Sequence, residues 1–523
     1  MVYYVFSIQG ITPGTGTEVE MGRIRFFFFD LIFRPGDWFL HFLAQHYALF
    51  RWFLSWTPPW VLNYSSRLRA WRAYQHAQLV VPAYQVFIEK NSVKGPRAFE
   101  EIPETDKDNY IKEYTTESRC KGGVIPMVNT LIDESSGSSG TPYNWVRSLE
   151  ERQVSHLFVS HFARYCFDLS RLITINAFSM GSWATGLNVG LSMQKNGIVK
   201  NVGPDIDKIL STIEFFGTSY AYLITGYPPF LKHLIDEATK RKFSWEKYKL
   251  YGLVGGEGMS EGLRDYLLTR FEKVYSGYGA TDLEIGIAGE TPISVAIRRA
   301  ARENVLLRKA IFGEDSRLPM VFHYNPMMHY IEINAKGEMI FTITRMNVLS
   351  PRIRYNIHDE GGIMDFNEMV ARCKNAGLDL EATFGDEFRA MPKLPFMWIY
   401  GRKDSTISVM GANIYPEDLE AALYANPELA KVTRSFCMSL HEMDEGGVRP
   451  KFEFEIVNSD VTESLAHEFY KKILEHLKVL NKDFAEAWHE HPTTLMPIVE
   501  LWNENCGPFK QNMNRIKQVR ITK

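Results

Sequence analysis

Residues 135–142 read Ser135-Ser136-Gly137-Ser138-Ser139-Gly140-Thr141-Pro142, and the interpretation of the whole chain turns on this stretch. Small residues let a backbone turn tightly and approach a phosphate, and the hydroxyls add donors to the backbone N–H groups. The apolar segment 124–132 is a candidate for the strand that leads into it. Because Thr141 and Pro142 follow Gly140, the stretch is neither G-x-x-x-x-G-K-[ST] nor G-x-G-x-x-G. On composition alone a flexible linker fits equally well, so the surrounding sequence must decide.

The composition is typical of a soluble enzyme with more than one domain. A chain of 523 residues is too long for a single hydrophobic core, and 45% hydrophobic with 23% charged residues is ordinary. A net charge of −3 without a basic block argues against nucleic acid as the main partner. The five cysteines are far apart, which fits neither a disulfide framework nor a thiolate zinc site. With no signal-peptide pattern, we expect a cytoplasmic protein.

Beyond residue 120, short apolar strands alternate with helical stretches, as in α/β folds. The pattern predicts helices at 207–216, 229–241 and 263–271, strands at 220–225 and 250–254, and an aromatic turn at 275–278. Residues 329–366 read as an antiparallel sheet or barrel, and those after 400 as a small α+β unit. We therefore predict an α/β fold: a large multi-subdomain N-terminal domain, with α/β layers and a small β-barrel-like part, and a small mobile α+β C-terminal domain. The predicted domains are 71–400 and 401–523, with a hinge at 401–404.

Residues 1–70 form an aromatic-rich N-terminal segment with two possible roles. Phe26 to Phe29 are consecutive, and many Trp and Phe residues follow as far as Trp60. A membrane-spanning helix needs about 20 mostly apolar residues, and charged residues together with Pro35 and Pro58 interrupt every such window. The segment either packs on the large domain or lies at a membrane interface, where Trp and Phe beside Arg are common. The sequence leaves both roles open.

A series of further motifs follows the loop in order. They are Gly255-Gly256-Glu257, Tyr278-Gly279-Ala280-Thr281-Asp282, Arg354-Tyr355 with Asp359, Gly401-Arg402-Lys403-Asp404, and 507–510, which ends in Lys510. Together they resemble the adenylate-forming enzymes, which comprise acyl-CoA synthetases, adenylation domains and luciferases. The resemblance runs over about residues 70–520 and looks closest to the phenylacetate–CoA ligase-like branch.

The resemblance implies a role for each matched residue. Residues Ser135, Ser136, Gly137, Ser138, Ser139, Gly140 and Thr141 would cradle the β- and γ-phosphates of ATP. The nucleoside would be bound by Gly256 and Glu257 against the adenine, by Tyr278 beside Gly279 as a stacking ring, and by Asp359 at the ribose. The reaction itself would involve Thr281 at the α-phosphate, Arg402 at ribose or phosphate oxygens, and Lys510 at the α-phosphate and the substrate carboxylate. Asp404 occupies the hinge position.

Three departures from the family pattern leave alternatives open. The Mg²⁺ ligand of the family is a glutamate, but this chain has Asp282, with Glu284 two residues on. Either carboxylate fits the preference of Mg²⁺ for oxygen ligands. Many members have a lysine after the proline of the loop, where this chain has Tyr143. Lys517 and Lys523 lie close to Lys510 and are alternatives to it as the tail lysine.

The resemblance implies an ATP-dependent, AMP-forming acid–thiol ligase. Such an enzyme forms an acyl-adenylate, releases pyrophosphate and transfers the acyl group to coenzyme A. Transfer to an amine or to a carrier-protein thiol is the alternative, and an inactive, membrane-associated binding protein is a second one. The segments expected to line the acyl pocket, 178–186, 225–229 and 252–255, are apolar, aromatic or Gly-rich. They favour a small carboxylic acid of the aryl or fatty type.

Overall fold

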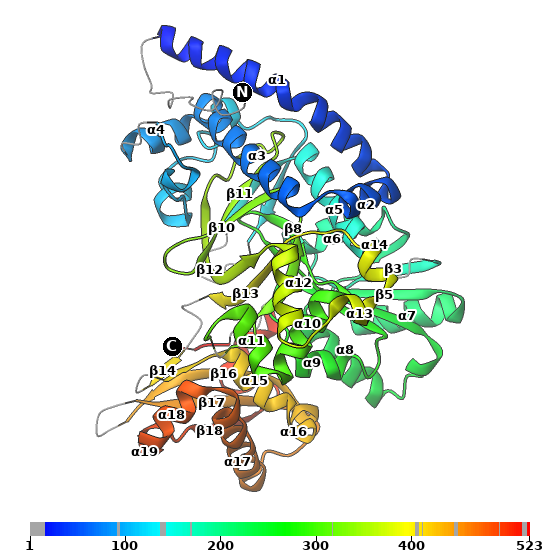
Figure 1. Cartoon of the computed structure of the whole chain (residues 1–523). Coiled ribbons are helices and arrows are strands. Elements are labelled where there is room, and N and C mark those ends of the chain that lie inside the picture. The colour runs from blue at the N-terminus through cyan, green and yellow to red at the C-terminus, as the bar shows by residue number, and fades with distance from the viewer. Residues whose placement is uncertain are drawn as a thin grey trace.

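A single mixed sheet organises the larger part of the molecule (Figure 1). The computed structural model describes residues 16–91, 95–135, 143–167, 170–181, 183–315, 317–402, 407–409, 412–443, 448–490, 492–514 and 520–522, and within these ranges eleven strands are hydrogen-bonded into this sheet. Their order is β10-β11-β12-β13-β9-β8-β7-β6-β5-β3-β4. The mixed α/β class predicted from the sequence is therefore confirmed.

One half of the sheet is parallel, with helical crossovers between its strands. Its strands are β4 (Ile198–Asn201), β3 (Leu172–Asn176), β5 (Ala221–Gly226), β6 (Lys249–Gly255) and β7 (Lys273–Ala280). The crossover helices are α6 (Ala184–Met193), α7 (Ile206–Phe216), α8 (Pro228–Lys240) and α9 (Glu261–Leu267). The predicted helices and strands agree with these bounds within a few residues, apart from the end of α9. The prediction of an aromatic turn at 275–278 was wrong. These residues belong to β7, where the Tyr275 ring is buried against Phe167.

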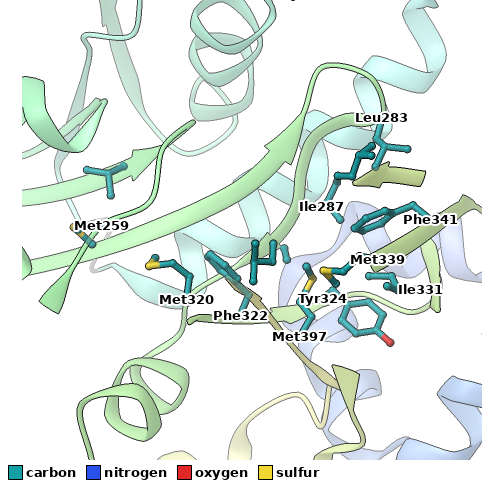
Figure 2. Close-up of a cluster of buried hydrophobic side chains, with 14 of the residues drawn as sticks. Met259, Leu283, Ile287, Met320, Phe322, Tyr324, Ile331, Met339, Phe341 and Met397 are labelled. Carbon is teal, nitrogen blue, oxygen red and sulfur yellow. The ribbon is translucent and has the colours of Figure 1, made fainter. Parts of the chain in front are cut away.

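The other half of the sheet is antiparallel. Its strands are β8 (Glu284–Gly289), β9 (Met320–Tyr324), β13 (Phe396–Arg402), β12 (Tyr355–Met364), β11 (Glu338–Ile343) and β10 (His329–Ile333). The antiparallel strands predicted over 329–366 are present, but they continue the large sheet and do not form a separate unit. Figure 2 shows Met320, Phe322, Met339, Phe341 and Met397 packing together on this half. Helices α10 (Pro292–Glu303), α11 (Val305–Phe312) and α12 (Phe366–Asn375) enclose a further core with β9 and β13.

The described part of the chain begins with the helices α1 (Gly16–Gln45), α2 (Tyr47–Trp56), α3 (Pro59–Val80) and α4 (Pro82–Lys90). The Arg72 guanidinium, on α3, is paired with Asp30 and Asp37 of α1, at 2.5 Å in each case. Figure 1 shows α1 as an outlying helix over α3, with α2 beside α5 (Leu149–Cys166). No helix in the described part of the chain is long and apolar enough to cross a membrane.

The C-terminal residues form their own core at the opposite end from α1 (Figure 1). Strands β16 (Thr433–Glu442), β17 (Val448–Ile456) and β18 (Ile498–Asn503) form one sheet, with α17 (Glu463–Leu480) packed against it. Helix α15 (Pro416–Tyr424) lies next to α9. The Ser260 N–H, at the start of α9, donates to the Glu420 carboxylate at 3.0 Å, and the Lys232 ammonium donates to the Thr433 carbonyl at 2.8 Å. These bonds fix the C-terminal part against α8 and α9.

Candidate active site

A cavity of about 1530 Å³ contains most of the described residues that the sequence motifs single out. It is larger than the roughly 300–1,000 Å³ that a drug-sized ligand needs. The predicted site residues that line this cavity are Ser135, Gly256, Glu257, Tyr278, Gly279, Thr281, Asp282 and Asp359. Residues up to 224 positions apart in the chain, from Ser135 to Asp359, thus meet at one place.

The predicted phosphate loop connects two paired strands. β1 (Thr130–Glu134) and β2 (Asn144–Ser148) are antiparallel, and the Tyr143 N–H donates to the Ser135 hydroxyl at 2.9 Å. Ser136, Gly137, Ser138, Ser139, Gly140 and Thr141 lie outside the described residues, so only Ser135 of the loop is placed. The predicted incoming strand at 124–132 is shifted, because β1 begins at Thr130 and the apolar side chain of Met127 is exposed.

Two glycines allow the tight turns that bring motif residues to the cavity. Gly256 follows β6 with φ of 81°, a left-handed conformation in which a side chain is strained, and the turn brings Glu257 to the cavity. At Gly279 a β-carbon would lie 2.9 Å from the Glu284 carbonyl oxygen, so the β7–β8 hairpin closes tightly only with glycine there. The motif residues 278–282 therefore sit at the point where the sheet changes from parallel to antiparallel.

Tyr278 and Asp359 are joined directly. The Tyr278 hydroxyl donates to Asp359 Oδ2 at 2.7 Å, and its ring lies near those of Phe322 and Phe341, with centroids 6.0 and 6.3 Å away. Asp359 of β12 is opposite Arg402 of β13 in the strand register. The Arg402 backbone thus lies beside the carboxylate that is predicted to bind the ribose. The side chain of Arg402 is outside the described part of the chain.

Asp282 and Glu284 point in different directions. Asp282 lines the cavity, where its Oδ2 accepts a hydrogen bond from the Tyr355 hydroxyl at 3.0 Å. Arg352 holds the Asp282 carbonyl at 2.9 Å, and Arg147 holds the Thr281 carbonyl at 2.6 Å. The turn that carries the motif is therefore anchored by buried guanidinium groups.

Glu284 is buried on the far side of the hairpin and is absent from the described cavity wall. Its carboxylate accepts from His329 Nε2 at 2.5 Å and also pairs with Arg345 and the Ser155 hydroxyl. Burial alone would raise its pKa, but Arg345 and His329 lower the pKa to about 2. Glu284 is thus a structural ion pair, and its expected role as a metal ligand does not fit its position. Residues 281–283 form a turn, so the side chains of Asp282 and Glu284 do not point to the same side as they would on an extended strand.

Of the remaining predicted residues, Lys510 is the one that the structure describes. Lys510 is exposed on the 3₁₀ helix Gly507–Asn514 and is absent from the described cavity wall. Asp404 and Lys517 lie outside the described residues, as does Lys523. Among the described residues, no group of three His, Cys, Asp or Glu side chains is arranged to hold a metal ion. Of the two carboxylates predicted as metal ligands, Asp282 is the one on the cavity wall.

Solved structures share this architecture. The 2-hydroxyisobutyryl-CoA ligase in its postadenylation state, in complex with 2-HIB-AMP, superposes with a TM-score of 0.63 over 88% of this chain and 89% of that chain, at 13% sequence identity. The chain has the fold of the adenylate-forming superfamily. The resemblance inferred from the motifs is confirmed at this level. In an open conformation with 2-HIB-AMP and CoA, the same ligase gives a TM-score of 0.51 over 88% of this chain and 91% of that chain, at 15% identity.

Sequence comparison points to the same superfamily. The 4-coumarate–CoA ligase-like 2 protein of Arabidopsis thaliana is 23% identical over 389 residues, which is 72% of this chain. The chain spans 61% of the length of that relative. No protein-family model matches the chain.

The adenylate-forming fold here includes cationic groups near the loop that were not predicted as site residues. The Lys107 ammonium lies 5.9 Å from the centre of the Tyr143 ring, and Lys107 lines the cavity next to Ser135. The Tyr143 hydroxyl accepts from Arg119 at 2.6 Å. Where many members have a lysine, this chain thus has a tyrosine with two cations around it.

The cavity also extends further than the predicted acyl pocket. Phe178, Ala184, Tyr227 and Leu253 come from the predicted segments. In addition, helix α2 contributes Tyr47, Phe50, Arg51 and Leu54. The sequence leaves open whether this N-terminal segment packs on the large domain, and no local pattern indicates that α2 packs on α5 and lines the cavity.

Proposed function

We propose that this protein activates a carboxylic acid with ATP, releases pyrophosphate and transfers the acyl group to coenzyme A. The observation that supports this proposal best is the convergence of Ser135, Gly256, Tyr278, Thr281 and Asp359 on one cavity. Each of these residues belongs to a sequence motif that resembles the nucleotide-binding motifs of the adenylate-forming enzymes. A flexible linker or an unrelated surface turn gives no reason for them to meet.

In the proposed first step, a carboxylate oxygen of the substrate attacks the α-phosphorus of ATP and the bond to pyrophosphate breaks. Both reactants are anionic, so donors must be in place before the reaction. Thr281 would donate to the α-phosphate, and Ser135 with its loop would hold the departing phosphates. Asp359, oriented by the Tyr278 hydroxyl at 2.7 Å, would accept from the ribose hydroxyls.

We assign the magnesium ion to Asp282, on the basis of its position on the cavity wall. When bound, the ion would supply positive charge against the phosphate oxygens. Tyr355 and the backbone anchors at Arg352 and Arg147 would keep Asp282 directed at it. Glu284 is not included in this assignment.

We further propose that residues 401–523 act as a domain that moves relative to 71–400 about the hinge at 401–404. Two separate hydrophobic cores support this division. Lys510 is exposed and away from the cavity wall, so it would reach the α-phosphate only after such a movement. The same movement would let coenzyme A approach the adenylate from another side.

Transfer to an amine or to a carrier-protein thiol shares the first step and is the alternative. A catalytically inactive binding protein is disfavoured by the retention of Thr281, Asp282 and Asp359 on one cavity wall. We propose a cytoplasmic location with peripheral contact to a membrane, based on the exposed Trp residues of the N-terminal helices.

The test is ATP–pyrophosphate exchange with a panel of aryl, short and long carboxylic acids, without coenzyme A. Exchange that depends on one class of acid supports adenylation and names the substrate class. Addition of coenzyme A, amines or carrier proteins then identifies the acceptor. Folded protein that binds no ATP would contradict the proposal.

A further inference from the structure

Helix α2 is apolar on two opposite faces. Tyr47, Phe50, Arg51 and Leu54 recur at helical spacing and line the cavity. On the other face, Leu49, Trp52 and Trp56 are 46%, 60% and 75% exposed. A helix that is apolar all round is normally buried or in contact with lipid. Since α2 is buried on one side only, its outer face requires an apolar partner.

The exposed aromatic surface extends from α2 onto its neighbours. Trp38, Phe39 and Phe42 of α1 and Trp60 of α3 are also exposed, with Trp38 and Trp60 both at 70%. From Trp38 to Leu62 the only residue with a formal charge is Arg51, which faces the cavity, and there is no Asp or Glu. We call this surface the aromatic face. The Phe39 ring of α1 contacts the Phe53 ring of α2, with centroids 6.2 Å apart, which joins the exposed rings of these two helices. Large exposed apolar surfaces mark interaction or membrane sites.

The composition of the aromatic face fits a lipid bilayer. Tryptophan rings are enriched at the level of lipid headgroups, because one end is apolar and the indole N–H is polar. Without an acidic residue, nothing on the face repels an anionic headgroup, whereas a protein interface normally has a polar rim. No described helix could cross the membrane, so the helices would lie in the interface with their outer faces immersed.

The cavity leads from α2 to the nucleotide motifs along an apolar wall. The Phe50 ring of α2 packs on Phe158 of α5, with centroids 5.5 Å apart. Further along the wall, Val159 and Phe162 of α5 lie so close to Gly286 and Gly289 of β8 that a β-carbon on either glycine would overlap them. β8 is hydrogen-bonded to β7, which ends at the Tyr278 motif. All four α5 and α2 side chains belong to the wall of the same cavity.

Polar groups on this wall are compatible with an apolar tail. His161 is buried against Phe50 and Tyr47, and burial lowers its pKa to about 4, so its ring is uncharged at neutral pH. The Arg51 guanidinium lies 5.6 Å from the centre of the Tyr165 ring, and its charge is thereby placed against an aromatic face.

We infer that the substrate is a long-chain fatty acid taken up from a bilayer, and that α2 is both the membrane contact and the end wall of the acyl pocket. The carboxylate would lie at Thr281 and the alkyl tail would run along α5 to α2. This inference rests on the proposed adenylation activity, and it specifies the substrate class of the same site.

The first experiment measures partition of the full-length protein onto phosphatidylcholine vesicles by flotation, without ATP. The double variant Trp52→Ala/Trp56→Ala should lose roughly tenfold or more of its partition, because two immersed rings are removed. Phe215→Ala, at an 84% exposed position on α7 away from this face, is the matched control and should partition like the wild type. Equal partition of the double variant and the wild type would overturn the inference.

The second experiment measures pyrophosphate exchange with hexanoate and with palmitate supplied in vesicles. Leu54→Trp fills the cavity at α2 and should lower the palmitate-to-hexanoate ratio of kcat/KM by roughly tenfold, since added volume in a packed site is poorly tolerated. Leu306→Trp makes the same change at a 75% exposed position on α11, outside the aromatic face and absent from the described cavity wall, and should leave the ratio unchanged. Phe50→Trp provides a second inner-face variant if Leu54→Trp does not fold.

The two proposals fail in different ways. Exchange with aryl or short acids alone, or the same palmitate-to-hexanoate ratio in the wild type and both folded inner-face variants, overturns the long-chain inference and leaves adenylation standing. The absence of exchange with any acid overturns both.

Discussion

At the scale of single residues, the bond between Tyr278 and Asp359 gives a graded prediction. Tyr278→Phe keeps the ring and removes the hydroxyl that donates to Asp359 Oδ2 at 2.7 Å. We expect KM for ATP to rise by about tenfold, since a hydrogen bond to a charged group contributes about 1.5 kcal/mol or more. Asp359→Ala removes the carboxylate that would bind the ribose, and it should lower kcat/KM for ATP by about a hundredfold. Exchange kinetics at varied ATP would measure both, and equal effects of the two variants would contradict the assignment.

Lys107 gives a second residue-scale prediction. It lines the cavity beside Ser135 and lies over the Tyr143 ring, at the place where many family members have a loop lysine. We expect Lys107→Ala to raise KM for ATP by about tenfold, because one phosphate-facing charge is lost. Lys90→Ala, at an exposed position whose partner is Glu113, is the control. Identical ATP affinities for the two variants would show that Lys107 has no part in phosphate binding.

At the scale of elements, Glu284 joins α5, β8 and β10 through Ser155, Arg345 and His329. Its pKa is lowered to about 2 from an ordinary value near 4.5, so its contribution to stability is complete above about pH 4.5 and is lost as the pH falls towards 2. Glu284→Gln should lower the free energy of unfolding at pH 7 by about 3–5 kcal/mol, because Arg345 is left buried without its partner. Denaturant titrations at a series of pH values should show that the difference in free energy of unfolding between the wild type and the variant becomes smaller below about pH 4.5.

Substitution of Asp282 should have the opposite effects from substitution of Glu284. Asp282→Asn should raise the Mg²⁺ concentration needed for half-maximal exchange by about tenfold and barely change stability, because Asp282 faces the cavity. Glu284→Gln should do the reverse. If Glu284→Gln raised the Mg²⁺ requirement more than Asp282→Asn, the assignment of the metal to Asp282 would be wrong.

At the scale of the whole molecule, the position of Lys510 gives a prediction that distinguishes the two proposed half-reactions. It is exposed on the C-terminal part and is absent from the described cavity wall. If it enters the site only for adenylation, Lys510→Ala should lower pyrophosphate exchange by more than about a hundredfold. The same variant, supplied with a preformed acyl-adenylate, should form the thioester at nearly the wild-type rate. A comparable loss in both assays would contradict a role limited to the first step.

The sequence by itself determined the α/β class and the resemblance to the adenylate-forming enzymes, and it singled out residues that the fold brings to one cavity. Motifs such as Tyr278–Asp282 depend on glycine, aromatic and hydroxyl residues at close spacing, and close spacing is preserved by local backbone geometry. Most helices and strands of the parallel half were predictable for the same reason, since their apolar periodicity is local. The turn predicted at 275–278 failed because burial in the sheet outweighed the turn signal of Gly277.

Only the tertiary structure decided which of two adjacent carboxylates faces the cavity, and that α2 forms its far wall. The first depends on the direction of side chains after a turn, which sequence spacing does not specify. The second depends on the packing of Phe50 on Phe158, two residues 108 positions apart. Long-range packing of this kind leaves no mark on either segment alone, because each reads as an ordinary apolar helix.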